Sequence, residues 1–141
     1  MKRPLHILLI LFSLSLFLSC DDVLDCLILN REPELPNKAF KVGSINSYYY
    51  DEFDAEIKNE PRDNDYGYEF DIEGNLPIGV EAFYDFRTFY LEGIPEEAGE
   101  FRFTVYVYVD PPLSYNPDTD TYEDNMCLTW TSKAYTLFIN P

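Results

Sequence analysis

An alternation of apolar and polar residues from Phe101 to Val109 constrains the fold of this chain more than any other feature. Its odd-numbered positions carry Phe or Val, and its even-numbered positions carry Arg, Thr or Tyr. Because successive side chains of a β-strand point to opposite faces, this period predicts a strand that packs one face on a core. Gly93, Pro95 and Gly99 predict a turn before it, which connects it to a strand that ends near Leu91.

Several other segments show the same period. Residues 66–73 alternate Tyr, Phe and Ile with Gly, Asp and Glu, and residues 48–57, 80–84 and 88–91 predict further strands. Residues 58–65 and 111–125 are rich in Pro, Asn and acidic residues and predict loops. No window has the 3.6-residue apolar period of a surface helix. The chain therefore predicts an all-β fold of about seven strands.

The last predicted strand shows a change of phase. Its first two apolar residues fall on even positions and its later three on odd positions (Leu128 and Trp130, then Tyr135, Leu137 and Ile139). If all five faced the core, the inward phase would switch between residues 131 and 134. An extra residue in one strand produces such a switch, so the pattern predicts a β-bulge there.

Three motifs resemble a family of bacterial envelope domains. Residues 76–80 read Leu-Pro-Ile-Gly-Val, residues 91–95 read Leu-Glu-Gly-Ile-Pro, and residues 98–105 read Ala-Gly-Glu-Phe-Arg-Phe-Thr-Val. In order and approximate spacing they resemble the putative-Ig and dystroglycan-type cadherin-like repeats, although Ile94 and Phe101 replace the usual Thr and Tyr. The resemblance implies an immunoglobulin-like β-sandwich of about seven strands. Such modules mostly act as spacers or binding domains, so it implies little about chemistry.

The first twenty residues resemble an export signal with a site for lipid attachment. Lys2 and Arg3 precede an uncharged apolar run over residues 5–18, which is too short to span a membrane and ends at Ser19 and Cys20. Residues 16–20, Leu-Phe-Leu-Ser-Cys, resemble a bacterial lipobox, which implies a lipid on Cys20. An ordinary signal peptide with an incidental Cys is the alternative. We therefore expect a signal peptide at 1–19, a lipidated Cys20 and neck at 20–32, and the sandwich at 33–141.

Composition bounds the location and the partners. Without Lys2 and Arg3, the ten basic residues fall to eight against 26 acidic ones, a net charge of −18. Such a charge repels nucleic acid, which we exclude as a partner. Aromatic residues make up 17% of the chain, too many for a disordered segment. We expect a folded domain in the bacterial cell envelope, anchored to a membrane through Cys20 and facing the periplasm or the exterior, with inner and outer membrane both open.

The residues that common catalytic sites require are scarce. His6 is the only histidine and lies in the signal segment, so triads and His-containing zinc sites have no source in the mature chain. Cys26 and Cys127 alone cannot form a structural zinc site, and a nucleophilic Cys would lack a base. Two carboxylates suffice for glycoside hydrolysis, but 26 acidic residues give that signal almost no specificity. We therefore expect no enzyme, with a small glycan-active enzyme as the weaker alternative.

An acidic loop raises the question of calcium. Asp118, Asp120, Glu123 and Asp124 supply the oxygen ligands that a hard cation prefers. The loop departs from the EF-hand pattern, because its sixth position is Glu123 rather than Gly. A solvated acidic loop is the simpler interpretation, so we expect no cofactor, with Ca²⁺ and a calcium-dependent structural or adhesion module as the alternative.

Two tyrosines are the candidates for partner binding. Tyr106 and Tyr108 fall on the face of their strand opposite Phe101 to Val109, so they are exposed or lie under another strand. Exposed aromatic side chains stack on sugars or bury against a protein. We expect a lipid-anchored envelope module with a non-catalytic binding or structural role, whose partner is a protein or a glycan.

The two remaining cysteines predict a disulfide. Cys26 and Cys127 are the only ones left once Cys20 carries lipid, and an exported protein meets an oxidising compartment in many bacteria. The resemblance agrees, because the first and last strands of an immunoglobulin-like sandwich run parallel and the two residues enter those strands at one end. Two buried free thiols are the alternative.

Overall fold

The structure is a computed structural model that describes residues 26–124 and 126–141. The predicted signal peptide, Cys20 and its lipid anchor lie outside the described residues. In the part that is described, no helix is long and apolar enough to cross a membrane.

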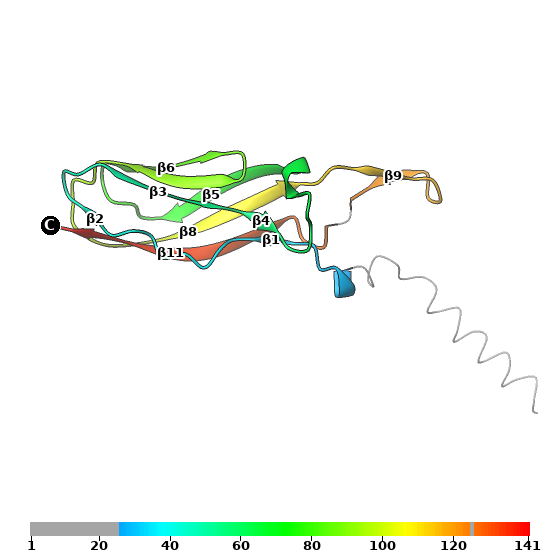
Figure 1. Cartoon of the computed structure of the whole chain (residues 1–141), viewed down its shortest axis with the longest axis horizontal. Helices are drawn as coiled ribbons and strands as arrows, with labels where there is room; N and C mark the ends of the chain where they lie inside the picture. Colours follow the sequence, from blue (N-terminus) through cyan, green and yellow to red (C-terminus); the bar gives the residue numbers. More distant parts are fainter. Residues whose placement is uncertain (1–25, 125) are drawn as a thin grey trace, which may run out of the picture.

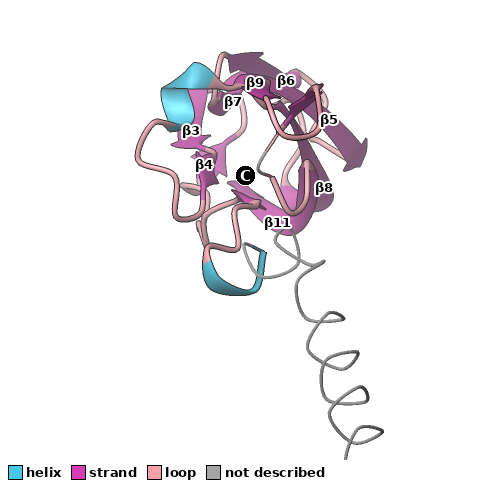
Figure 2. Ribbon diagram, turned by 90° about the vertical axis from the view of Figure 1, so that its right-hand side faces the viewer, coloured by secondary structure: helices cyan, strands magenta, loops and turns pink. Residues whose placement is uncertain are grey.

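Two sheets form the body of the domain. One is four-stranded in the order β2–β11–β8–β5, and the other is three-stranded in the order β3–β7–β6. β2 runs parallel to β11, and the other pairs within these sheets are antiparallel. Viewed along the long axis, the strands lie around a common interior (Figure 2). The all-β prediction is confirmed.

The elements have the following bounds along the chain. The strands of the two sheets are β2 (Gly43–Ser44), β3 (Tyr49–Asp54), β5 (Gly67–Gly74), β6 (Val80–Asp85), β7 (Thr88–Gly93), β8 (Gly99–Asp110) and β11 (Trp130–Asn140). Two short pairs join β1 (Pro33–Glu34) to β4 (Glu56–Ile57) and β9 (Ser114–Asn116) to β10 (Thr121–Glu123), and a 3-10 helix covers Asp63–Asp65. The β9–β10 hairpin projects beyond one end of the domain (Figure 1).

The core lies between the two sheets and is rich in aromatic rings. Phe53 of β3 stacks on Phe89 of β7 at 5.1 Å between ring centroids and on Tyr135 of β11 at 5.2 Å, so it joins both sheets. Phe40 packs on Phe53 and on Tyr135 from the segment between β1 and β2. In β8 the residues at 103, 105, 107 and 109 are buried, as the alternation predicted, while Phe101 is only partly buried.

The predicted β-bulge in the last strand is wrong. β11 pairs with β8 residue for residue, from Trp130 opposite Tyr108 to Ile139 opposite Gly99. The odd-numbered residues of β11 therefore face the core along its whole length. Trp130 lies on the outer face, and Leu128 before it is exposed. The prediction failed because it assumed that every large apolar residue faces the core, whereas outer faces also carry aromatic side chains.

Two glycines bring the start of β6 against the end of β7. Gly79 has φ +86° and Gly93 has φ +151°, which L side chains rarely adopt. A Cβ at Gly93 would lie 2.0 Å from the Gly79 carbonyl oxygen, so the backbones touch. The Ile94 N–H donates to that oxygen at 2.8 Å, and Pro77 and Pro95 are fully buried on either side. The first two motifs of the family resemblance, residues 76–80 and 91–95, thus lie in direct backbone contact with each other.

Asp51 is a buried charge in the core, with 2% of its surface exposed. Its carboxylate accepts hydrogen bonds from Lys38 Nζ at 2.9 Å, the Lys41 N–H at 2.8 Å and the Glu52 N–H at 3.0 Å. Burial raises the pKa of Asp51, but these donors outweigh it and hold the pKa below its ordinary value. Asp51 thereby fastens the segment before β2 to the three-stranded sheet.

The predicted disulfide between Cys26 and Cys127 is confirmed, with 5.4 Å between their Cα atoms. The Cys127 N–H also donates to the Arg31 carbonyl at 2.8 Å, so backbone and covalent contacts join the same two segments. This junction and the β9–β10 hairpin lie at one end of the domain, and the C-terminus lies at the other (Figure 1).

Candidate functional site

One row of side chains crosses the outer face of the four-stranded sheet beside the hairpin. Register places Glu69 of β5 opposite Tyr108 of β8, and Tyr108 opposite Trp130 of β11. Tyr108 is 44% exposed and Trp130 is 51% exposed. Among the described residues, neither ring forms an aromatic pair, so both keep exposed surface that a ligand can contact. The row combines two aromatic surfaces with a carboxylate.

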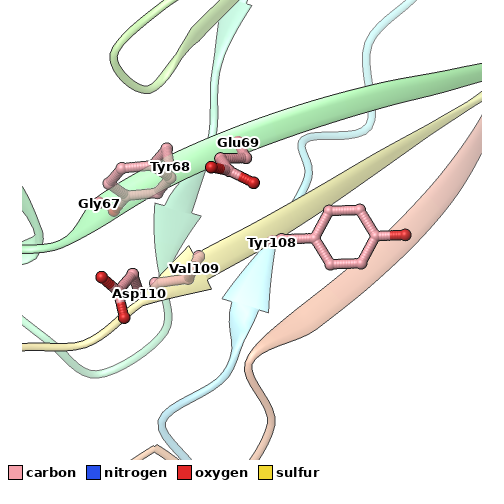
Figure 3. A pocket seen from close by; sticks show the side chains of 6 residues that line it. All are labelled: Gly67, Tyr68, Glu69, Tyr108, Val109 and Asp110. Atoms are coloured by element: carbon pink, nitrogen blue, oxygen red, sulfur yellow. The ribbon is translucent and has the colours of Figure 1, made fainter.

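A shallow cavity of about 390 Å³ opens at the β5 end of this row. Figure 3 shows Glu69 and Tyr108 along the two strands and Asp110 beyond them, at the end of β8. The cavity exists partly because Gly67 stands opposite Asp110 and has no side chain, since a Cβ there would lie 3.3 Å from the Asp110 Cβ. Glu69, Tyr108 and Asp110 therefore line one concave, solvent-accessible cavity, and Trp130 lies next to Tyr108 outside it. We call these four residues the outer-face site.

The structure separates the two tyrosines that the sequence predicted as a binding pair. Tyr108 belongs to the outer-face site, whereas Tyr106 lies one row further along the sheet and is only half-exposed. The Tyr106 hydroxyl donates to Glu73 at 2.9 Å, and this hydrogen bond to a carboxylate raises the pKa of Tyr106. Binding at either residue stays a prediction, but Tyr108 is the one beside the cavity.

The four acidic residues predicted as calcium ligands lie on and beside the β9–β10 hairpin, and local donors satisfy three of them. Glu123 accepts hydrogen bonds from Asn116, Thr121 and Thr119, which lower the pKa of Glu123 to about 2. Asp120 accepts one from the Tyr115 hydroxyl at 2.7 Å, and Asp124 accepts one from the Met126 N–H at 2.9 Å.

A metal site needs ligands that converge. Across the described residues, no three or more His, Cys, Asp or Glu side chains are placed to hold a metal ion. Asp118 lies at the turn of the hairpin, where its own N–H donates to Asn116. Calcium binding by this loop stays a prediction without geometric support.

Three residues of the outer-face site were not predicted from the sequence: Trp130, Glu69 and Asp110. Trp130 was assigned inward because of the mistaken phase switch. An unbroken register would have placed the even positions of β8 and β11 on one face and found the pairing of Trp130 with Tyr108. Nothing in the sequence indicated that Gly67 opens space beside Asp110, since the two residues are brought together only by the sheet.

Comparisons with known proteins bear on the fold. No protein-family model matches the sequence, and no curated protein matches it. A solved structure with a similar fold is an endo-fucoidan hydrolase of glycoside hydrolase family 107 (MfFcnA9), with a TM-score of 0.53 and 16% identity. The similarity covers 92% of this chain and 20% of that chain, so this chain spans about a fifth of the enzyme's length.

This similarity contradicts the expectation that the protein is not an enzyme. The expectation relied on the lack of histidine and on the low specificity of any carboxylate pair among 26 acidic residues, yet the matched chain is a glycoside hydrolase.

Proposed function

We propose that this protein recognises glycan chains in the cell envelope, with the outer-face site as its binding site and a lipid on Cys20 as its anchor. The observation that carries the proposal is the row of Glu69, Tyr108 and Trp130 beside a cavity of about 390 Å³. The fold similarity to an endo-fucoidan hydrolase supports a glycan as the class of ligand.

The chemistry of the site suits a sugar ring. One face of a pyranose consists of C–H groups, which pack on the exposed rings of Tyr108 and Trp130. Its hydroxyls donate to acceptor oxygens, which Glu69 and Asp110 supply at the cavity. A few polar groups that fix orientation beside an apolar surface are typical of small-ligand sites.

The negative charge of the cavity favours some glycans over others. The residues that line the cavity include two carboxylates and no Lys or Arg. A negative field of this kind repels sulfated or uronate-rich chains. We therefore propose neutral polysaccharides as ligands, a class that differs from the fucoidan for which the matched enzyme is named.

The test is calorimetric titration of neutral and sulfated oligosaccharides into the domain and two variants. Trp130→Ala should weaken binding of a neutral oligosaccharide by about tenfold, because stacking on an aromatic ring contributes on the order of 1.4 kcal/mol. Phe138→Ala is the matched control, because Phe138 lies on the same strand and face at 46% exposure but far from the cavity. Equal affinity of the wild type and Trp130→Ala would refute the site.

Glycan hydrolysis is the second candidate function. Glu69 and Asp110 stand diagonally across the β5–β8 pair, positions about 7–8 Å apart in an antiparallel sheet. The carboxyl groups of inverting glycosidases lie roughly 6.5–9.5 Å apart, a separation that two acidic side chains on diagonal positions can adopt. Release of reducing ends from polysaccharide by the wild type, and its loss in Glu69→Gln, would support hydrolysis. Binding without release would leave recognition as the function.

The immunoglobulin-like topology and the anchor belong to the same proposal. The parallel pairing of β2 with β11 supports an immunoglobulin-like sandwich. The lipobox-like residues before Cys20 support lipidation. Changing Cys20→Ala should release the protein from membranes in a salt wash, and extraction that still requires detergent would refute the anchor.

A further inference from the structure

The outer face of the three-stranded sheet carries a continuous strip of aromatic rings. Tyr50 of β3, Tyr90 of β7 and Phe83 of β6 cross the sheet side by side, and we call them the aromatic strip. The ring centroids of Tyr50 and Tyr90 are 5.6 Å apart, as are those of Phe83 and Tyr90. Register aligns Phe83 directly with Tyr90, so the strip spans the full width of the sheet.

The aromatic strip is exposed on the side away from the core. Tyr50 is 39% exposed and Phe83 is 41% exposed, while Tyr90 between them is half-buried by its neighbours. Tyr48 extends the apolar surface at the β3 end. Contiguous apolar surface of this kind marks interaction sites more often than isolated exposed residues do.

Carboxylates surround the strip, and no cation lies among them. Besides the three rings and Thr88, the outward positions of β3, β7 and β6 are all acidic (Glu52, Asp54, Glu81, Asp85 and Glu92). Among the described residues, none of these five carboxylates forms an ion pair. Tyr50 donates to Glu52, and Tyr48 donates to Glu92 at 2.7 Å, so hydroxyl groups orient the carboxylates beside the rings.

We propose that this face docks a cationic segment of a protein partner, with Arg or Lys side chains stacked on the aromatic strip and paired with the carboxylates around it. A guanidinium or ammonium group gains both from the ring quadrupole and from adjacent negative charge. The free faces for stacking are the outer sides of Tyr50 and Phe83, because Tyr90 is covered by both neighbours.

Charge favours a cationic protein segment over a second copy of this chain or a glycan as the ligand of this face. A second copy of the chain carries 26 acidic against 10 basic residues and would bring like charges together. A neutral glycan would use the free ring faces but would leave the negative charge of the five carboxylates uncompensated, and two of the nearby phenol hydroxyls already donate to Glu52 and Glu92. A cationic protein segment uses both the ring surface and the carboxylates.

The test titrates a short peptide of alternating arginine and alanine into the full chain and follows amide shifts by nuclear magnetic resonance. Binding should shift the resonances of β3, β6 and β7. The double change Glu52→Gln with Glu81→Gln should weaken it about tenfold, and so should Phe83→Ser. Asp71→Asn with Glu73→Gln is the matched control, because it removes the same charge from the outer face of the other sheet.

Each other outcome overturns the proposal. Equal weakening by the two double changes would show attraction to net charge without a defined face. Shifts confined to β5 and β8 would place the peptide elsewhere. A sedimentation profile that shows dimers in the wild type and monomers in Phe83→Ser would make a second copy the occupant.

Discussion

The contribution of Asp51 to stability can be worked out from its contacts. The change Asp51→Asn keeps the shape of the side chain but removes the charge that faces Lys38 and the N–H groups of Lys41 and Glu52. It also replaces one acceptor oxygen with an NH₂ group, which cannot accept a hydrogen bond from Lys38 or from either N–H group. The variant therefore loses more than one hydrogen bond.

The magnitude follows from burial. Removing one partner of a buried ion pair costs about 3–5 kcal/mol, because the other charge stays desolvated. The Lys38 side chain is 24% exposed and can turn toward water, so we take the lower end, about 3 kcal/mol. That is a large part of the roughly 5–15 kcal/mol that stabilises a typical domain.

The sign of the pH dependence is fixed by the lowered pKa of Asp51. A carboxylate whose folded pKa lies below the unfolded value of about 3.9 stabilises the fold above that pH, and the contribution is lost as the pH falls through the folded pKa. The difference in unfolding free energy between the wild type and Asp51→Asn should therefore be constant from neutral pH to about pH 5 and narrow below about pH 4.

Urea unfolding followed by tryptophan and tyrosine fluorescence measures both quantities. Glu81→Gln is the control, because it removes an exposed carboxylate of the same sheet and should change stability by less than about 0.5 kcal/mol. A loss below about 1 kcal/mol in Asp51→Asn, or a difference that persists unchanged to the lowest pH, would refute the reasoning.

Three further predictions follow from the described geometry. Gly93→Ala should lower stability by at least about 2 kcal/mol in thermal unfolding, because a Cβ would meet the Gly79 carbonyl at a strained φ; an unchanged melting temperature would contradict this. Changing Cys26 and Cys127 together to Ala should cost about 4–5 kcal/mol by the chain-entropy argument, since the bond closes a loop of 101 residues, and wild-type urea stability would count against it. Tyr50 should stay protonated at pH 11 in a spectrophotometric titration, because its hydrogen bond to Glu52 raises the pKa of Tyr50 to about 12; loss of this behaviour in Glu52→Ala would confirm the cause.

The strands and their inward residues could be predicted because burial of one face imposes a local period of two. Phe53, Ala55 and Ile57 share a buried face, as their spacing indicated, and so do the odd positions of β8. Asp51 occupies the same inward face, yet its partners lie 10 and 13 residues upstream in a segment without periodicity. The alternation along a strand cannot show which buried carboxylate will be hydrogen-bonded by donors from another segment.

The candidate site was less accessible to sequence reasoning because it depends on pairing between distant strands. Tyr108 was found, since alternation places it outside the core. Its neighbour Trp130 was misplaced, because an aromatic residue has the same sequence signature on either face of a sheet. The aromatic strip of Tyr50, Phe83 and Tyr90 draws one ring from each of three strands, so no single segment reveals it.

The Cys26–Cys127 bond has a mechanical consequence. A pulling force applied between Cys26 and the C-terminus passes through the bond and then along residues 127–141 alone. Most of that path is β11, whose 11 residues are already extended over about 36 Å. The loop of 101 residues carries none of the load, so the domain is an almost inextensible link under tension. Reduction would place that loop in the path and allow it to lengthen by up to roughly 340 Å.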